Sequence, residues 1–198
     1  MKKPIKALLL AAGKGTRLRP ITLKKPKCLV EINGIPILDR WLKKLNQLKV
    51  NAILINTHYL YSQVEDFLAI SKYKSKSIRI FHEEILLGTA GTLIANKHFF
   101  KGSTGLLIHA DNYTNINLDE LLKAHQRRPS NCLLTMLTFN TKYPKRCGVV
   151  ETDKDGILIG FHEKKSDPPG NKANGAIYVF DYEFLDLLES KYPEAKDF

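Results

Sequence analysis

The sequence predicts an α/β fold: a doubly wound, mainly parallel, Rossmann-like sheet with helices on both faces. Three observations predict it. Short apolar runs, the length of buried parallel strands, recur along the chain, for example at residues 5–10, 52–55 and 104–109. Segments with helical periodicity lie between these runs. The length of 198 residues is that of one domain, which we place at residues 1–198, with a single core.

The first half of the chain is expected to alternate strands with helices. A turn at Asn33-Gly34 leads into a helix whose apolar face places Trp41 in the core rather than against a nucleobase. Ser62 is expected to cap a second helix that continues through Leu68. The apolar face of the first helix is formed by Ile37, Leu38, Trp41, Leu42, Leu45 and Leu48. The predicted strands are residues 5–10, 28–32, 52–55 and 77–81.

The second half continues this pattern and ends in antiparallel structure. A helix is expected through Leu93, and Asn117 is expected to begin another, at residues 118–127. The sequence Asp153-Lys154-Asp155-Gly156 is a hairpin turn signal between two short strands. The predicted strands are residues 104–109, 131–138, 147–150, 157–161 and 173–180.

Charge and cysteine content restrict the function. The net charge of +11 suits polyanionic small molecules, nucleic acid or an acidic membrane surface. Nucleic acid ranks last, because the basic loop has no aromatic residues interleaved with its cations. Cys28, Cys132 and Cys147 lack metal-ligand spacing, which indicates reduced thiols in a cytoplasmic protein. The apolar stretch at residues 7–12 is too short for a secretory signal, and no segment is long enough to span a membrane.

A small-residue loop follows the first strand and carries the main functional signal. Ala11, Ala12 and residues 13–17 (Gly-Lys-Gly-Thr-Arg) leave backbone amides open to an anion, as in a phosphate cradle. Leu9 stands where a Walker loop needs glycine, and Leu18 stands where a dinucleotide fingerprint needs a small residue, so both common phosphate loops are excluded. The cations of the segment are Lys14, Arg17, Arg19, Lys24, Lys25 and Lys27.

The pattern L-A-A-G-K-G-T-R-L-R-P-I-T-x-x-x-P-K, at residues 10–27, resembles the signature of the sugar-1-phosphate nucleotidyltransferases. Members of that family join a nucleoside triphosphate to a sugar 1-phosphate and release pyrophosphate. The resemblance implies that Arg17 and Lys27 are catalytic: Arg17 stabilises the leaving pyrophosphate, and Lys27 bridges the α-phosphate and the incoming phosphate. It implies nucleotide contacts from Leu10, Ala12, Gly13, Gly15, Thr16, Glu83, Gly88 and Thr89.

The run L-G-T-A-G at residues 87–91 contacts the base in that family. Gly88 and Gly91 permit close approach by a flat ligand. Glu83 falls where a residue that reads the base edge is expected, and a carboxylate accepts from the two neighbouring donors of guanine. We therefore hypothesise that Glu83 favours guanine; the alternative is an exposed carboxylate at a strand end.

Asp111 follows the predicted strand at residues 104–109 and occupies the position of the family's metal ligand, with Ala110 in place of the usual glycine. The resemblance thus implies Mg²⁺ as cofactor, held by Asp111 against phosphate oxygens. The family usually has a second metal-binding aspartate beyond the last residues of this sequence. Residues 193–197 lead toward a further element, so relative to the family the chain is either shortened or lacks one metal ligand.

Three later motifs resemble the sugar-binding half of the family: C-G-V-V at 147–150, F-H-E-K at 161–164 and N-G-A-I-Y at 174–178. They imply a small β-hairpin subregion that binds the sugar phosphate. Gly148 would leave room beside the sugar, Glu163 would accept from hydroxyls and Lys164 would meet the phosphate. Asn174 would orient the ring. Taken alone, Glu163-Lys164 is an exposed charge pair, and Lys165 replaces the proline that usually follows.

The motifs are most similar to mannose-1-phosphate guanylyltransferases, so GTP and mannose 1-phosphate are the expected substrates. Glucose-1-phosphate thymidylyl- or uridylyltransferases and heptose-1-phosphate guanylyltransferases are alternatives. A non-catalytic subunit that binds a nucleotide sugar is an alternative of another class, favoured by the missing second aspartate. We expect small-molecule substrates, with no nucleic-acid or membrane partner, and leave assembly into a homo-oligomer open.

Overall fold

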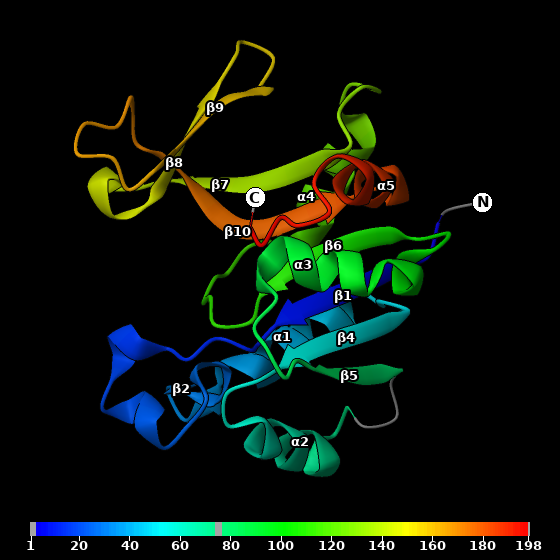
Figure 1. Ribbon diagram of the computed structural model, residues 1–198, viewed down its shortest axis with the longest axis vertical. Coiled ribbons are helices and arrows are strands. Elements are labelled where there is room, and N and C mark those ends of the chain that lie inside the picture. Colours follow the sequence, from blue (N-terminus) through cyan, green and yellow to red (C-terminus); the bar gives the residue numbers. More distant parts are fainter. Residues whose placement is uncertain (1–2, 74–76, 198) are drawn as a thin grey trace.

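The computed structural model describes residues 3–73 and 77–197, and Figure 1 labels its elements. A single eight-stranded sheet runs through the molecule. Four adjacent strands of this sheet are parallel, in the order β5, β4, β1, β6. They are β1 (Ile5–Leu10), β4 (Ala52–Thr57), β5 (Ile78–His82) and β6 (Thr104–His109).

Antiparallel strands extend the sheet beyond β6. β10 (Lys172–Phe180) pairs with β6, with β7 (Leu134–Asn140) and, near its start, with β8 (Gly148–Thr152). β8 and β9 (Leu158–Glu163) form the predicted hairpin, which projects from the body of the molecule in Figure 1. Asp153 shapes the turn, because its carboxylate accepts the amide N–H groups of Asp155 and Ile157.

Helices cover both faces of the sheet, which confirms the doubly wound α/β expectation (Figure 1). One face packs against α1 (Ile37–Gln47), α2 (Tyr61–Ile70) and α4 (Leu118–Arg127). The other packs against α3 (Gly88–Ala95) and α5 (Tyr182–Lys191). Successive residues of β1 alternate between the two cores, with Leu9 in the first and Leu8 in the second. No helix among the described residues has the length and hydropathy to cross a bilayer.

The two amphipathic helices form where the sequence predicts them. Ile37, Leu38, Trp41, Leu42 and Leu45 are the buried face of α1. Trp41 is a core residue, as expected, and its indole N–H donates to the carbonyl of Asn112 at 2.9 Å. Asn117 caps α4, since its side chain accepts the amide N–H of Asp119 at 3.0 Å.

Two local predictions are wrong. Residues 28–32 are not one strand: a 3-10 helix at Lys27–Leu29 precedes β2 (Glu31–Ile32), which forms a small hairpin with β3 (Ile35–Pro36). The turn predicted at Asn33-Gly34 joins these strands, and both residues have positive φ. Ser62 does not cap α2, because the helix already starts at Tyr61. The helix α5, the last helix among the described residues, was not predicted.

Candidate active site

A pocket of about 400 Å³ opens at the carboxyl ends of the parallel strands. It is lined by the loop after β1, the ends of β4 and β6, the turn between β5 and α3, and residues 196–197. Parallel α/β sheets bind ligands at this edge. The pocket therefore lies where the fold class predicts a ligand site.

The phosphate-loop residues divide into two groups. Leu10, Ala12 and Gly13 line the pocket, and a Cβ on Gly13 would meet nothing within 4 Å, so this stretch of backbone is open. Gly15 serves the turn itself: its φ is +61°, and the buried hydroxyl of Thr22 donates to its carbonyl at 2.8 Å. Gly15, Thr16 and Arg17 do not line the pocket, and their contacts with nucleotide stay predictions.

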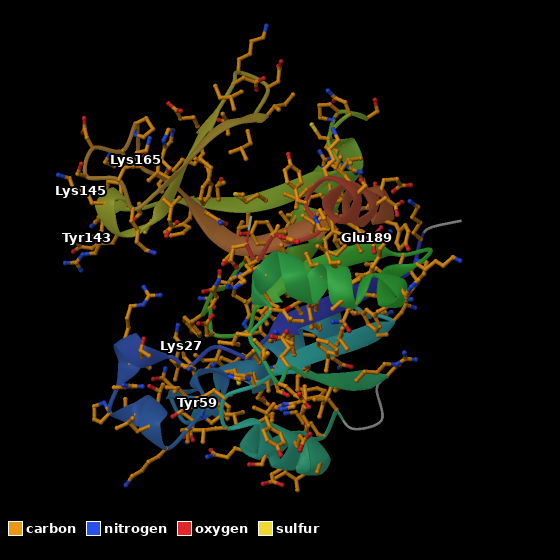
Figure 2. The ribbon with its side chains drawn as sticks, viewed as in Figure 1. Lys27, Tyr59, Tyr143, Lys145, Lys165 and Glu189 are labelled. Carbon is orange, nitrogen blue, oxygen red and sulfur yellow. The ribbon has the colours of Figure 1, made fainter. Side chains whose placement is uncertain are left out.

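The predicted catalytic lysine and the predicted metal ligand come together in the pocket. The ammonium of Lys27 and the carboxylate of Asp111 form an ion pair, with 28% and 30% of their side chains exposed. Asp111 is brought there because the amide of Ala110 donates to the carbonyl of Leu10 at 3.0 Å, which extends the pairing of β1 and β6 by one residue. Figure 2 labels Lys27 beside the blue segment that follows β1.

Two neighbours of this pair are uncharged at neutral pH. Burial lowers the pKa of His109, although Asp111 and Asp197 oppose that shift. Burial raises the pKa of the Cys28 thiol to about 12, so it does not act as a thiolate. His109 and Cys28 thus line the pocket as neutral groups beside the ion pair.

Glu83 is buried, with 3% of its surface exposed, so the alternative of an exposed strand-end carboxylate is wrong. Its Oε1 atom accepts from the amide of Asn56 at 2.8 Å and from the hydroxyl of Thr92 at 2.6 Å. Its Oε2 atom accepts the backbone N–H of Leu87 at 3.1 Å. Glu83 lines the pocket, but most of its hydrogen-bonding capacity is used within the protein.

Asn56, at the end of β4, is a pocket residue that sequence reasoning missed. Its side-chain oxygen accepts the amide N–H of Ala11 at 2.7 Å, and its nitrogen donates to Glu83. A polar residue ending an apolar strand was the available signal, since such positions meet at the ligand-binding edge of a parallel sheet.

Residues 196–197 form a wall that was also not predicted. The carbonyl of Lys196 accepts the amide N–H of Ala90, and the carboxylate of Asp197 accepts that of Thr89 at 3.0 Å. Gly88 has φ +77°, and a side chain there would collide with the Lys196 carbonyl. The close approach that Gly88 permits is thus made by the protein's own backbone, while Gly88 and Thr89 also line the pocket.

The four predicted sugar-phosphate residues do not line this pocket. Gly148 and Glu163 are register partners in the β8–β9 hairpin, and a Cβ on Gly148 would lie 2.8 Å from a Glu163 carboxylate oxygen. Lys164 pairs with Glu163, and more than half of each side chain is exposed. Asn174 donates to the hydroxyl of Tyr178 at 2.7 Å in β10. Their sugar-binding roles stay predictions.

The hairpin region and the pocket nevertheless share one side of the molecule. In Figure 2, Tyr143, Lys145 and Lys165 project from the region beside the hairpin on the same side as Lys27 and Tyr59. A hydrogen bond joins segments next to the two regions: the side-chain amide of Asn112, the residue after Asp111, donates to the carbonyl of Gly175 in β10 at 3.0 Å.

The fold and the pocket define a doubly wound α/β protein with an open glycine loop and a lysine–aspartate pair at the ligand-binding edge of its parallel sheet. A sequence profile described as "Nucleotidyl transferase" matches residues 6–198. The chain belongs to the sugar-1-phosphate nucleotidyltransferase family, which confirms the expectation from the glycine-loop signature.

The similar proteins have several substrates in their names. A Mycobacterium tuberculosis mannose-1-phosphate guanylyltransferase is 28% identical over 93% of this chain and 51% of its own length. A mannose-1-phosphate guanylyltransferase catalytic subunit beta from Drosophila pseudoobscura is 33% identical over 94% and 50%. A UTP–glucose-1-phosphate uridylyltransferase from Synechocystis is 28% identical over 94% and 51%. The chain thus spans about half the length of these curated relatives.

Among solved structures, one from Bacillus anthracis described as a candidate glucose-1-phosphate thymidylyltransferase in complex with a sucrose superposes with a TM-score of 0.85. It is 23% identical and is matched over 97% of this chain and 77% of its own. This similarity concerns the fold, which is Rossmann-like in both proteins.

Proposed function

We propose that this chain catalyses the transfer of a nucleotide from a nucleoside triphosphate to a sugar 1-phosphate, with release of pyrophosphate. The observation that supports it most is the Lys27–Asp111 pair in the pocket directly beside the open backbone of the glycine loop. GTP and mannose 1-phosphate are the preferred substrates of the proposal, supported by the motifs and by the names of similar proteins.

Catalysis would rest on positioning and charge neutralisation. A phosphate oxygen of the sugar 1-phosphate attacks the α-phosphorus, and the bond to the leaving pyrophosphate breaks. No general base is needed, because the attacking oxygen is already anionic. Lys27 would hold the α-phosphate and the incoming phosphate together, while Arg17 and the amides of residues 13–16 would neutralise charge on pyrophosphate.

Mg²⁺ is the proposed cofactor, and Asp111 is the residue that would hold it. The described residues contain no group of three or more potential metal ligands. One carboxylate at the glycine loop fits Mg²⁺, which commonly takes one or two protein carboxylates together with substrate phosphates and water. When bound, the ion would neutralise phosphate charge. Lys27 would then exchange its contact with Asp111 for a phosphate oxygen.

The assignment of GTP and mannose 1-phosphate as substrates is tested by a panel assay. Pyrophosphate production from GTP, UTP, dTTP and ATP, each crossed with mannose, glucose and heptose 1-phosphates, tests it. The proposed substrates predict the highest kcat/KM for GTP with mannose 1-phosphate. The sequence-based hypothesis that Glu83 selects guanine predicts that Glu83→Gln loses the preference for GTP over UTP, and an equal loss for both nucleotides would reject that hypothesis.

A non-catalytic nucleotide-sugar-binding subunit is the second candidate. One observation favours it: all three carboxylates that line the pocket already have partners within the protein. Asp111 pairs with Lys27, Asp197 accepts the N–H of Thr89, and Glu83 accepts from Asn56 and Thr92. Binding of GDP-mannose without pyrophosphate release from any substrate pair would select this candidate. We place either activity in the cytoplasm, in agreement with free Cys28, Cys132 and Cys147.

A further inference from the structure

Three buried polar side chains from different elements lie together at the wall of the pocket, and two of them, Asn56 and Glu83, line it. Asn56 is the second-last residue of β4, Glu83 follows β5, and Thr92 belongs to α3. Each has 3% or less of its surface exposed. Burying a polar group costs folding free energy unless the group is hydrogen-bonded. The hydrogen bonds of this cluster therefore indicate what the three residues do.

The amide of Asn56 has one defined orientation. Its oxygen faces the N–H of Ala11, which only donates, and its nitrogen faces the carboxylate of Glu83, which only accepts. Ala11 begins the glycine loop. Asn56 therefore fixes the start of the loop that would receive the phosphates.

Both oxygens of Glu83 face donors. Oε1 meets Asn56 and Thr92, and Oε2 meets the N–H of Leu87, the residue before Gly88. A continuous chain of hydrogen bonds thus runs from Ala11 through Asn56 and Glu83 to Leu87. It joins the phosphate loop to the turn that would hold the base.

We propose that Asn56 and Glu83 are a pair of positioning residues that hold the phosphate loop and the base turn in register for one nucleotide. This inference rests on the proposed function. The Asn56–Glu83 pair holds two loops in place relative to each other. Loss of the pair therefore weakens the binding of every nucleoside triphosphate alike. Base preference is then set elsewhere, because Glu83 has one acceptor position left and guanine offers two neighbouring donors.

The directions of these bonds give a sharp test. Glu83→Gln alone places an amide N–H against either Asn56 or Leu87. Asn56→Asp alone places two carboxylates side by side. The double change, Asn56→Asp with Glu83→Gln, reverses the pair: the carboxylate now on β4 accepts from Ala11 and from the new amide nitrogen, and the new amide oxygen accepts from Leu87. Every bond along the chain from Ala11 to Leu87 is restored with the same net charge.

A matched control lies at the other end of the same strands. The side-chain oxygen of Asn51 accepts the N–H of Ile5 at 2.9 Å, in the same way as Asn56 accepts that of Ala11, but far from the pocket. Asn51→Asp keeps that acceptor. It should leave nucleotide affinity unchanged.

The experiment is calorimetric titration of the full chain with GTP and with UTP, accompanied by urea unfolding of each variant. We expect each single variant to lose about tenfold or more in affinity for both nucleotides. The double variant should return to within about threefold of wild type. The ratio of GTP affinity to UTP affinity should be the same in every variant as in wild type. A residue that reads the base would change that ratio, whereas a positioning residue would not.

Several results would overturn the inference. Single variants that bind as tightly as wild type would do so, as would a double variant no better than the weaker single one. If a single variant does not fold, the double variant decides by regaining, or failing to regain, both folding and affinity. A wild-type chain that binds no nucleoside triphosphate would remove the proposed function, and this inference with it.

Discussion

The backbone carbonyl of Lys196 accepts the amide N–H of Ala90 at 2.8 Å, and this bond draws residues 196–197 across the first turn of α3. Asp197 adds a second contact at Thr89. A segment more than a hundred residues further along the chain therefore shapes the turn that the family resemblance assigns to the base. Gly88 is the residue that permits this approach.

Gly88→Ala should destabilise the fold markedly. The residue has φ +77°, and its new methyl group would collide with Lys196. Backbone strain and the collision together should cost about 3 kcal/mol of unfolding free energy. Gly102→Ala is the control, since Gly102 has φ +69° but nothing within 4 Å of an added Cβ, so strain alone should cost about 1 kcal/mol. Equal urea midpoints for the two variants would disprove this account.

Lys27→Ala should lower kcat/KM for pyrophosphate release by about 100-fold or more, because it removes a fixed cation from the pocket. Lys25→Ala is the matched change in the same loop. Lys25 pairs with Glu31 at the surface and should tolerate replacement within about twofold. Retained activity in Lys27→Ala would refute the assigned role.

Arg17→Ala should cause a similar loss, although Arg17 does not line the pocket and lies in an exposed 3-10 helix at Thr16–Leu18. The expected cause is lost stabilisation of pyrophosphate, so kcat should fall by about 100-fold with unfolding free energy unchanged. Arg19→Ala, two residues further on, is the control. Comparable rates for the two variants would show that Arg17 acts only as surface charge.

Asp111→Asn should abolish activation by Mg²⁺. Wild-type pyrophosphate release should rise with Mg²⁺ and stop in EDTA, whereas the variant should stay at least about 100-fold below wild type at every Mg²⁺ concentration. Asp119→Asn, at the start of α4, controls for loss of one surface carboxylate. A variant rescued fully by Mg²⁺ would argue that Asp111 does not hold the ion.

His125 makes stability depend on pH in a predictable direction. Burial lowers the pKa of this histidine from 6.5 to about 4, although Asp181 opposes the shift. The unfolded chain therefore takes up a proton at a higher pH than the folded chain. Stability is retained above pH 6.5 and is lost as the pH falls toward 4, by up to about 1.4 kcal/mol per unit.

The comparison of urea unfolding at pH 7 and pH 5 for wild type and His125→Gln isolates this effect. Other titrating groups contribute to both proteins, so the difference between them reports the histidine. Wild type should lose more stability than the variant over this interval. Equal losses would contradict a depressed pKa.

The sequence predicts most where burial leaves a clear pattern, either a continuous apolar run for a strand buried on both faces or an apolar stripe for a helix buried on one. The strand at residues 5–10, the strand at 104–109 and the helix at 118–127 are confirmed to the residue. The segment at 28–32 misled, because the buried Cys28 and Leu29 resemble a strand but belong to one 3-10 turn. That turn instead sets Lys27 toward Asp111.

Long-range polar pairing was beyond sequence reasoning. Glu83 and Asn56 are 27 positions apart, and Asp197 is 108 from Thr89; neither separation has a local signature. The phosphate loop and Lys27 were predicted because one motif specifies them together, and Asp111 because it follows a buried strand at the position of the family's metal ligand. Whether a motif residue faces a ligand or its own backbone, as at Gly88, depends on packing that only the fold reveals.

β10 contains an irregularity between its pairing with the hairpin and its pairing with the parallel sheet. Its pairing with β7 shifts between Asn174 and Tyr178, and Ala176 there has φ +52°. Before this point the strand pairs with the hairpin strand β8, and after it with β6 of the parallel sheet. β7 pairs with β10 on both sides of the interruption, whereas β8 and β6 each pair with one side. We therefore expect a change of register between β8 and β9 to leave the pairing of β10 with β6 intact.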